Sequence, residues 1–187
     1  MTDNRINPQR TAAILVGTEE YADKNLQSLP AAWDNVVSLF RFFSQTIGIP
    51  QTNISRIFNA EDPRNIIQKL GEIQKREDID TILFYYSGHG LMDEDMKEYY
   101  LSLTNTRLGE ELEYSSVSIK SLSRRLGSTD QKIILILDSC FSANAFNSFS
   151  SKNFLILASS KADEVSRFTS FFKTSSSTNE KCELLVQ

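Results

Sequence analysis

Histidine and cysteine are the scarcest reactive residues in this chain of 187 residues, which has one histidine, His89, and two cysteines, Cys140 and Cys182. One histidine and two distant cysteines cannot supply the four ligands of a structural zinc site. Two cysteines also cannot build the disulfide framework of a small secreted domain. The scarcity excludes zinc modules and disulfide scaffolds, and it predicts free thiols in a reducing, cytoplasmic setting.

Long apolar runs and concentrated positive charge are absent as well. No apolar stretch approaches the roughly 18 residues that a membrane-spanning helix needs. Residues 1–10 are polar and lack the apolar core of a secretory signal. The net charge is −4, whereas binding a nucleic-acid backbone requires clustered lysine and arginine. The densest basic cluster, Ser123–Arg125, is interpreted as a solvated helix face, so neither a membrane nor a nucleic acid is predicted as a partner.

What remains is a globular pattern of short apolar runs alternating with stretches of helical periodicity. This alternation predicts one α/β domain, in which a mostly parallel central sheet is covered by helices on both faces. The expected strands cover residues 11–17, 53–59, 80–88, 131–139 and 153–160. The expected helices cover residues 29–47, 62–77, 116–126 and 163–173. Between them, residues 91–98 are predicted to form a polar loop, residues 99–105 a small hairpin arm, and residues 141–152 a second loop.

The two most informative positions are His89 and Cys140, because each follows the end of an apolar strand-like run. The runs read "DTILFYYSGHG" and "QKIILILDSCFSA". Parallel strands end at the same edge of a sheet, so we expect the two side chains to face each other there. Histidine beside a thiol takes up its proton or stabilises the thiolate, which is the nucleophile. Gly88 and Gly90 are expected to let the backbone turn sharply and a substrate approach closely.

Attack of a thiolate on an amide carbonyl creates an oxyanion, which backbone N–H groups at a glycine-rich turn can hold. The N–H groups of Gly90 and Cys140 are the natural donors. Each reactive residue has a structural alternative, since a histidine can be a satisfied structural residue and a cysteine a small buried hydrophobe. Their joint position at strand ends, among small neighbours, favours catalysis. Cys182 lies in a polar tail and is interpreted as a bystander.

These motifs resemble those of the caspase-like cysteine peptidases, the group that includes caspases, metacaspases, paracaspases and bacterial relatives. "FYYSGHG" resembles the histidine motif of the family and "LILDSCFSA" its cysteine motif. "AAILVGTEEY" resembles the first strand with its Gly-x-x-x-Tyr turn, "LPAAWDNVVSLFRFF" the first helix, and "LILASSKADEVS" the fifth strand. The resemblance implies a caspase-hemoglobinase-like three-layer sandwich with a peptidase domain over residues 11–173, after a polar arm (1–10) and before a polar tail (174–187). It also implies that His89 is the general base and Cys140 the nucleophile.

The resemblance also implies a substrate preference. True caspases carry "QAC" at the nucleophile, whereas this chain has Asp138 in "DSC", as metacaspases and paracaspases do. A carboxylate at the floor of a pocket pairs with arginine or lysine, so cleavage after a basic residue is expected. Glu164, in "KADEVS", aligns with a second acidic pocket residue of paracaspases. The alternatives are that Asp138 caps backbone N–H groups at the strand end and that Glu164 is a solvated loop charge.

Three features depart from the family pattern. The usual "DSCHSG" is here "DSCFSA", with Phe141 and Ala143, which predicts a stiffer loop after the nucleophile. The acidic run that contains Asp93, Glu94 and Asp95 raises the question of calcium, since some metacaspases need this ion, but its spacing is not that of a calcium loop. No resident metal or cofactor is therefore expected. The chain also stops where the family supplies a sixth strand, so it is either a fragment or obtains that strand from elsewhere.

The leading functional prediction is an endopeptidase that hydrolyses proteins or peptides after Arg or Lys through a thioester acyl-enzyme. The sequence as a whole resembles those of bacterial caspase-like effectors of signalling or defence. This resemblance implies activation by a partner chain or by cleavage. A catalytically silent caspase-like scaffold is the alternative. A flavodoxin- or receiver-like signalling domain shares the sheet but is disfavoured, because no phosphate-binding glycine loop and no acidic cluster follow the first strand.

Overall fold

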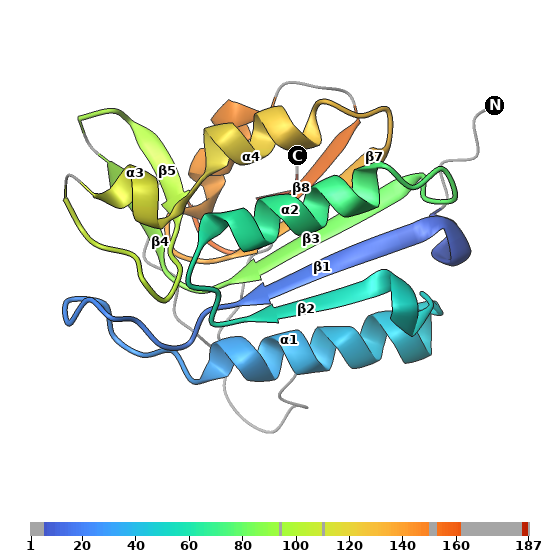
Figure 1. Cartoon of the computed structure of the whole chain (residues 1–187), viewed down its shortest axis with the longest axis horizontal. Coiled ribbons are helices and arrows are strands. Elements are labelled where there is room, and N and C mark those ends of the chain that lie inside the picture. The colour runs from blue at the N-terminus through green and yellow to red at the C-terminus, as the bar shows by residue number, and fades with distance from the viewer. Residues whose placement is uncertain (1–5, 94, 110, 150–152, 162–184, 187) are drawn as a thin grey trace.

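A six-stranded sheet forms the centre of the computed structural model, which describes residues 6–93, 95–109, 111–149, 153–161 and 185–186 (Figure 1). The strand order is β2-β1-β3-β7-β8-β9. All neighbouring pairs are parallel except the last, in which β9 runs antiparallel to β8. The strands are β1 (Thr11–Gly17), β2 (Ile54–Phe58), β3 (Thr81–Ser87), β7 (Lys132–Asp138), β8 (Phe154–Ala158) and β9 (Leu185–Val186).

Helices cover both faces of this sheet, as the sequence predicts. Helix α1 (Ala31–Arg41) lies on one face, and α2 (Pro63–Gln74) and α4 (Ile119–Leu126) lie on the other (Figure 1). Successive strand residues point to opposite faces, so Ile14 packs in the core under α2 and α4, whereas Leu15 packs in the core under α1. Both faces of the central strands are therefore buried, which explains why their sequences are continuously apolar.

Helices α2 and α4 both begin with a side-chain cap. The cap of α2 lies where the sequence predicts it, and the cap of α4 lies later in the chain than predicted. Asp62 caps α2 by accepting a hydrogen bond from the backbone N–H of Arg64 at 2.8 Å, as the sequence predicts. The predicted start of the next helix at residue 116 is wrong, because Ser118 is the N-cap of α4 and accepts from the N–H of Ser121 at 3.2 Å. Val117–Ser118 instead forms a short strand, β6.

A second, antiparallel sheet stands beside the carboxyl edge of the first. It contains β4 (Gly90–Asp93), β5 (Glu98–Leu101) and β6. The hairpin is confirmed, but the prediction of a polar loop over residues 91–98 is wrong at both ends, where the chain is strand. The carboxylate of Asp93 caps the turn by accepting from the N–H groups of Asp95 and Met96 at 3.0 and 2.9 Å. Turn-forming acidic residues therefore concealed a strand that is only four residues long.

The chain after β7 differs from the expectation in two further ways. The predicted loop 141–152 contains a 3-10 helix at Ser142–Ser148. The last element, β9, provides a sixth strand, which the sequence analysis did not expect from this chain. The predicted helix 163–173 lies outside the described residues. In the part of the chain that the structure describes, no helix is long and apolar enough to cross a membrane.

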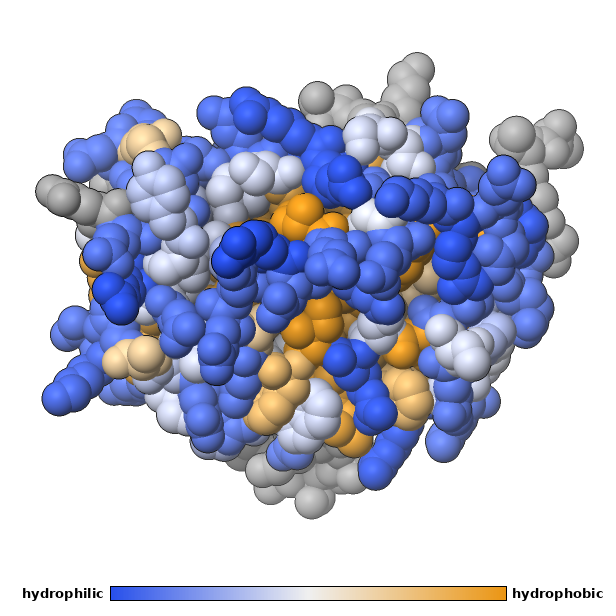
Figure 2. Space-filling model, viewed as in Figure 1, coloured by the Kyte–Doolittle hydropathy of each residue, from blue (hydrophilic) through white to orange (hydrophobic). Residues whose placement is uncertain are grey.

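The opposite edge of the large sheet, β2, is bordered by a partly apolar surface. Figure 2 shows apolar residues gathered near the middle of the face on which β2 and α1 lie. The Phe58 ring packs 4.4 Å from the Trp33 ring, and the Arg56 guanidinium lies 4.2 Å over the ring of Phe40. An arginine on an edge strand discourages further strands from pairing there. The side chains of this edge thus favour a sheet that ends at β2.

Candidate functional site

The strand register brings the two reactive motifs together at one edge of the sheet. Ser87, the last residue of β3, pairs with Asp138, the last residue of β7. His89 and Cys140 each follow two positions later, so the prediction that they leave adjacent parallel strands is confirmed. The strand order reverses between β1 and β3, and sites in open α/β sheets collect at such a reversal.

The imidazole of His89 is oriented by a backbone carbonyl from the loop before α1. Its Nε2 atom lies 2.8 Å from the carbonyl oxygen of Gln27. Because a carbonyl oxygen can only accept, Nε2 carries the proton, and in the neutral ring Nδ1 then keeps the basic lone pair. Burial lowers the pKa of His89 below its ordinary value of 6.5, although the bond to Gln27 opposes this shift. The neutral, proton-accepting imidazole is therefore the main form at pH 7.

Tyr21 holds His89 from the side of β1. Its hydroxyl accepts a hydrogen bond from the backbone N–H of His89 at 3.0 Å and donates to the carbonyl of Thr18 at 2.9 Å. The two rings also touch, with centroids 4.8 Å apart. The loop after β1 thus fixes both the backbone and the ring of His89.

Cys140 is buried, with 6% of its surface exposed, and lies in a turn with Phe141. Phe141 has a φ of 56°, in the left-handed region that bulky residues rarely occupy. Its carbonyl accepts hydrogen bonds from the backbone N–H and the side-chain amide of Asn144, at 3.0 and 2.9 Å. Two donors from one residue therefore hold the chain in this unfavourable conformation beside the candidate nucleophile.

The two glycines around His89 provide space rather than an unusual backbone conformation. Neither Gly88 nor Gly90 has a positive φ, so the expected glycine-dependent turn is not what they supply. A Cβ atom on Gly90 would lie 2.2 Å from the carbonyl oxygen of Cys140 and 2.2 Å from the hydroxyl of Tyr99. A Cβ on Gly88 would lie 2.2 Å from the hydroxyl of Tyr86. The sequence GHG is therefore needed so that two tyrosine hydroxyls and the cysteine backbone can approach this segment.

Asp138 places a buried carboxylate on the α1 side of the sheet, next to the cysteine. Its Oδ2 atom accepts hydrogen bonds from the side-chain amide of Asn35 and the hydroxyl of Tyr85, both at 3.1 Å. Burial raises the pKa of Asp138 above 3.8, although the hydrogen bonds from its neighbours oppose the shift. No ion pair within the described ranges involves Asp138. The carboxylate is thus held by neutral donors and has no counter-charge there.

Of the predicted site residues, the structure gathers His89, Gly90, Asp138 and Cys140 at the paired ends of β3 and β7. Glu164 lies outside the described residues. Sequence reasoning did not identify the residues that hold these four in place, which are Tyr21, Asn35, Tyr85, Tyr99, Asn144 and Ser160. Of these residues, only Tyr21 belongs to a recognisable sequence motif, because it ends the Gly-x-x-x-Tyr turn.

The acidic and cysteine side chains do not gather into a cation site in the described part of the chain. Nowhere in that part do three His, Cys, Asp or Glu side chains lie close enough together to hold a metal ion. Asp93, one of the acidic residues considered for calcium, uses its carboxylate to cap the turn between β4 and β5.

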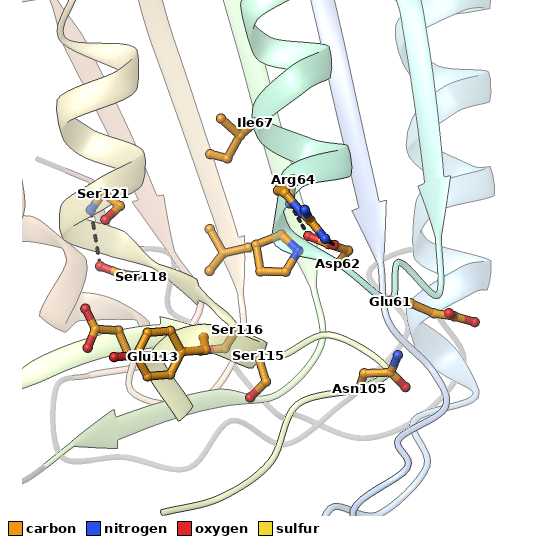
Figure 3. Close-up of a pocket in the computed structure, with 13 residues that line it drawn as sticks. Glu61, Asp62, Arg64, Ile67, Asn105, Glu113, Ser115, Ser116, Ser118 and Ser121 are labelled. Carbon is orange, nitrogen blue, oxygen red and sulfur yellow. Dashed lines mark hydrogen bonds and ion pairs between the residues drawn. The ribbon is translucent and has the colours of Figure 1, made fainter. Parts of the chain in front are cut away.

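A separate pocket of about 550 Å³ opens between the starts of α2 and α4 (Figure 3). Asp62 and Arg64 lie together in it, with the guanidinium Nε 2.8 Å from the carboxylate. Tyr114, one of the residues that line it, is 80% exposed. None of the four gathered site residues lines this pocket, so it is distinct from the candidate site.

Comparison with solved structures identifies the same fold in caspases. A protein of Geobacter sulfurreducens superposes with a TM-score of 0.63 at 13% identity, covering 87% of this chain and 77% of that one. Caspase-1 of Spodoptera frugiperda gives 0.59 at 15% identity, covering 91% and 71%. The Drosophila initiator caspase Dronc gives 0.55 at 14% identity, covering 81% and 55%. At these identities the likeness shows the fold alone.

Comparison at the level of sequence identifies the family. No curated protein matches this sequence. The family model described as "Caspase domain" matches residues 10–179, which is most of the chain and includes both strand ends described above. With the fold and the family model in agreement, the chain belongs to the caspase-domain family of cysteine peptidases.

Proposed function

We propose that this protein is a cysteine endopeptidase that cleaves after arginine or lysine, with Cys140 as nucleophile and His89 as general base. The observation that carries the proposal is the pairing of Ser87 with Asp138, which sets the two residues on adjacent strand ends. The Nε2–H tautomer of His89 supports it further, because Nδ1 is then the atom that can take up the thiol proton.

The proposed reaction has two halves. In the first, the Cys140 sulfur attacks the scissile carbonyl carbon while His89 accepts the thiol proton, and the N–H groups of Gly90 and Cys140 hold the oxyanion. The C–N bond then breaks, the departing amine takes the proton from His89, and a thioester remains. In the second half, water attacks the thioester carbonyl while His89 accepts a proton from the water. The C–S bond then breaks, the acid product leaves, and the Cys140 sulfur takes the proton back from His89.

Asp138 supports the preference for basic residues, because a buried carboxylate that forms no ion pair with any described residue is suited to a cationic side chain. An arginine would bring its own positive charge and planar pair of donors to that carboxylate. Glu164 is proposed as a second acidic contact. The natural substrate is proposed to be a protein or peptide, and full activity is proposed to require a partner chain or cleavage.

We expect a peptide-library digest to show cleavage after Arg and Lys, at least about 100-fold faster than after other residues, given the energy of a buried ion pair. The digest is run with and without calcium, and a dependence on calcium would place an ion in the activation step. Cleavage without preference at this position, or after acidic residues, would contradict the pocket assignment. If an arginine-ketone probe forms no adduct at Cys140 under any activating condition, with limited proteolysis and added partner chains included, the silent-scaffold alternative is favoured instead.

The pH dependence should reflect the lowered pKa of His89. Because the folded-state pKa lies below 6.5, the base stays neutral through pH 7, and kcat/KM should decline in acid only below about pH 6.5. The free energy of unfolding should decrease over the same range, because the unfolded chain binds a proton at His89 before the folded chain does. The measurement is kcat/KM for an arginine peptide at pH 4.5 to 8.

A control separates the titration of His89 from that of Asp138 in this pH profile. The pKa of Asp138 is raised above 3.8, so its protonation also weakens binding of arginine at low pH. Alkylation of Cys140 by iodoacetamide needs no substrate pocket, and its rate should retain the decline that is due to His89. A midpoint above pH 6.5 in both experiments would contradict the orientation and burial of His89 described here.

A further inference from the structure

The backbone on both sides of Cys140 is held by two side-chain hydroxyl groups, one from β5 and one from the segment just after β8. Tyr99, in β5, donates from its hydroxyl to the carbonyl oxygen of Cys140 at 2.8 Å. Ser160, just after β8, donates from its hydroxyl to the carbonyl oxygen of Ser139 at 2.9 Å. The first bond fixes the peptide group that follows the nucleophile, and the second fixes the peptide group that precedes it.

The direction of each hydrogen bond follows from simple proton accounting. A phenol has one proton, and a carbonyl oxygen can only accept, so the proton of Tyr99 goes to Cys140. The hydroxyl of Ser139, 2.7 Å from that of Tyr99, must then donate to Tyr99. This gives a directed chain, Ser139 to Tyr99 to Cys140. Burial raises the pKa of Tyr99 well above its ordinary value, so the phenol keeps its proton at any usual assay pH.

The second bond has a consequence for the proposed oxyanion site. In a trans peptide group the C=O and N–H bonds point in opposite directions, and no peptide bond of the described chain is cis. Holding the carbonyl of Ser139 toward Ser160 therefore turns the N–H of Cys140 away from Ser160. A hydrogen bond accepted by a peptide carbonyl also strengthens the N–H of the same group as a donor. Ser160 thus orients and polarises one of the two proposed oxyanion donors.

Both hydroxyls are themselves firmly placed. Tyr99 is 3% exposed, and its hydroxyl occupies the space that a side chain on Gly90 would need. Ser160 is 5% exposed, and its hydroxyl accepts from the backbone N–H of Ser142 at 3.1 Å. Its own N–H donates to the hydroxyl of Ser142 at 3.0 Å. These bonds join the segment after the nucleophile to the end of β8.

We propose that Tyr99 and Ser160 are positioning residues that clamp the two peptide groups flanking Cys140, an inference that rests on the proposed peptidase function. The clamp links β5, β7 and the end of β8. It fixes where the sulfur attacks from and where the N–H of Cys140 points, and neither hydroxyl needs to touch the substrate.

The test compares Tyr99→Phe and Ser160→Ala with a matched control, Tyr100→Phe. Tyr100 is the next residue of the same strand and is fully buried, and its hydroxyl has no hydrogen-bond partner in the described part of the chain. Tyr100→Phe therefore removes the same atom from the same strand without touching the clamp. All three variants are made in the full chain, and thermal unfolding establishes that each is folded.

Two measurements are made on every folded variant. Hydrogen exchange by mass spectrometry should show the amides of residues 139–142 exchanging at least about fivefold faster in Tyr99→Phe and Ser160→Ala, but not in Tyr100→Phe. In both clamp variants kcat on an arginine peptide should decrease about five- to tenfold, with KM changed less than about twofold. If a residue serves only stability, its replacement should lower the unfolding temperature but leave kcat of the folded enzyme unchanged.

Each outcome has a definite meaning. Exchange in Tyr99→Phe that equals exchange in Tyr100→Phe overturns the clamp, and so does unchanged kcat in an active enzyme. If Ser160→Ala fails to fold, Tyr99→Phe decides alone, because it preserves the shape of the ring. If the wild type neither hydrolyses peptides nor forms an adduct at Cys140, the proposed peptidase function fails, and the exchange rates then decide by themselves whether the clamp exists.

Discussion

Replacing Cys140 by alanine should lower kcat/KM for an arginine peptide by about 10⁴-fold or more, because the sulfur that forms the acyl-enzyme is gone. The fold should survive, since the change removes one buried atom from a segment that the hydrogen bonds of Tyr99 and Ser160 hold through its backbone. The free energy of unfolding should change by only about 1 kcal/mol. The measurement is steady-state hydrolysis together with chemical unfolding on the same preparation.

The chain offers a matched control for this experiment in Cys182→Ala, which makes the same substitution at the other cysteine. That variant should keep wild-type kinetics, and it should also keep the single adduct that an arginine-ketone probe forms at Cys140. Wild-type rates in Cys140→Ala would show that the nucleophile lies elsewhere. A loss of activity in both variants, with both still folded, would show that the assay depends on thiols in general.

Asp138→Asn should separate substrate recognition from stability. The change keeps the shape of the side chain and an oxygen that can accept from Asn35 and Tyr85, but it removes the negative charge. With no charge to pair with arginine, kcat/KM for an arginine peptide should decrease at least about 100-fold. A peptide with citrulline, the neutral isostere of arginine, should be almost unaffected, so the ratio of the two rates measures the charge alone.

The stability of Asp138→Asn should change in the opposite direction. The folded-state pKa of Asp138 is raised above 3.8, so the folded chain holds a proton at pH values at which the unfolded chain has lost it. Stability therefore decreases as the pH rises through that window and stays lower above it. A neutral asparagine avoids this cost, and the variant should be at least as stable as the wild type at pH 7.

This pair of results distinguishes the two interpretations of Asp138. If the carboxylate mainly caps the strand end, asparagine should lower stability and leave the preference for arginine intact. If it forms the floor of a pocket that accepts basic residues, asparagine should leave stability unchanged and abolish the preference for arginine. Unchanged arginine kinetics would remove Asp138 from the recognition site.

The main elements of the fold were predictable because their signals are local. Buried parallel strands such as Thr81–Ser87 are continuously apolar, and α2 carries its own cap in Asp62. The failures were also local in origin. The turn residues around Asp93 concealed the short strand β4, and polar Ser118 belongs to a two-residue strand and caps α4 at once. Strands of two to four residues are too short to show a hydrophobic periodicity, so whether they form depends on their pairing with neighbouring strands.

By itself, the sequence determined the chemistry available to this protein: one histidine and one cysteine after apolar runs, and a carboxylate two residues before the cysteine. These depend on residue type and on short-range order, which are properties of the chain. Only the tertiary structure decided how that chemistry is held. Asn35 reaches Asp138 across 103 positions, Tyr21 reaches His89 across 68, and Tyr99 reaches Cys140 across 41. Such hydrogen bonds depend on distances of about 3 Å between distant segments, and folding alone creates those distances.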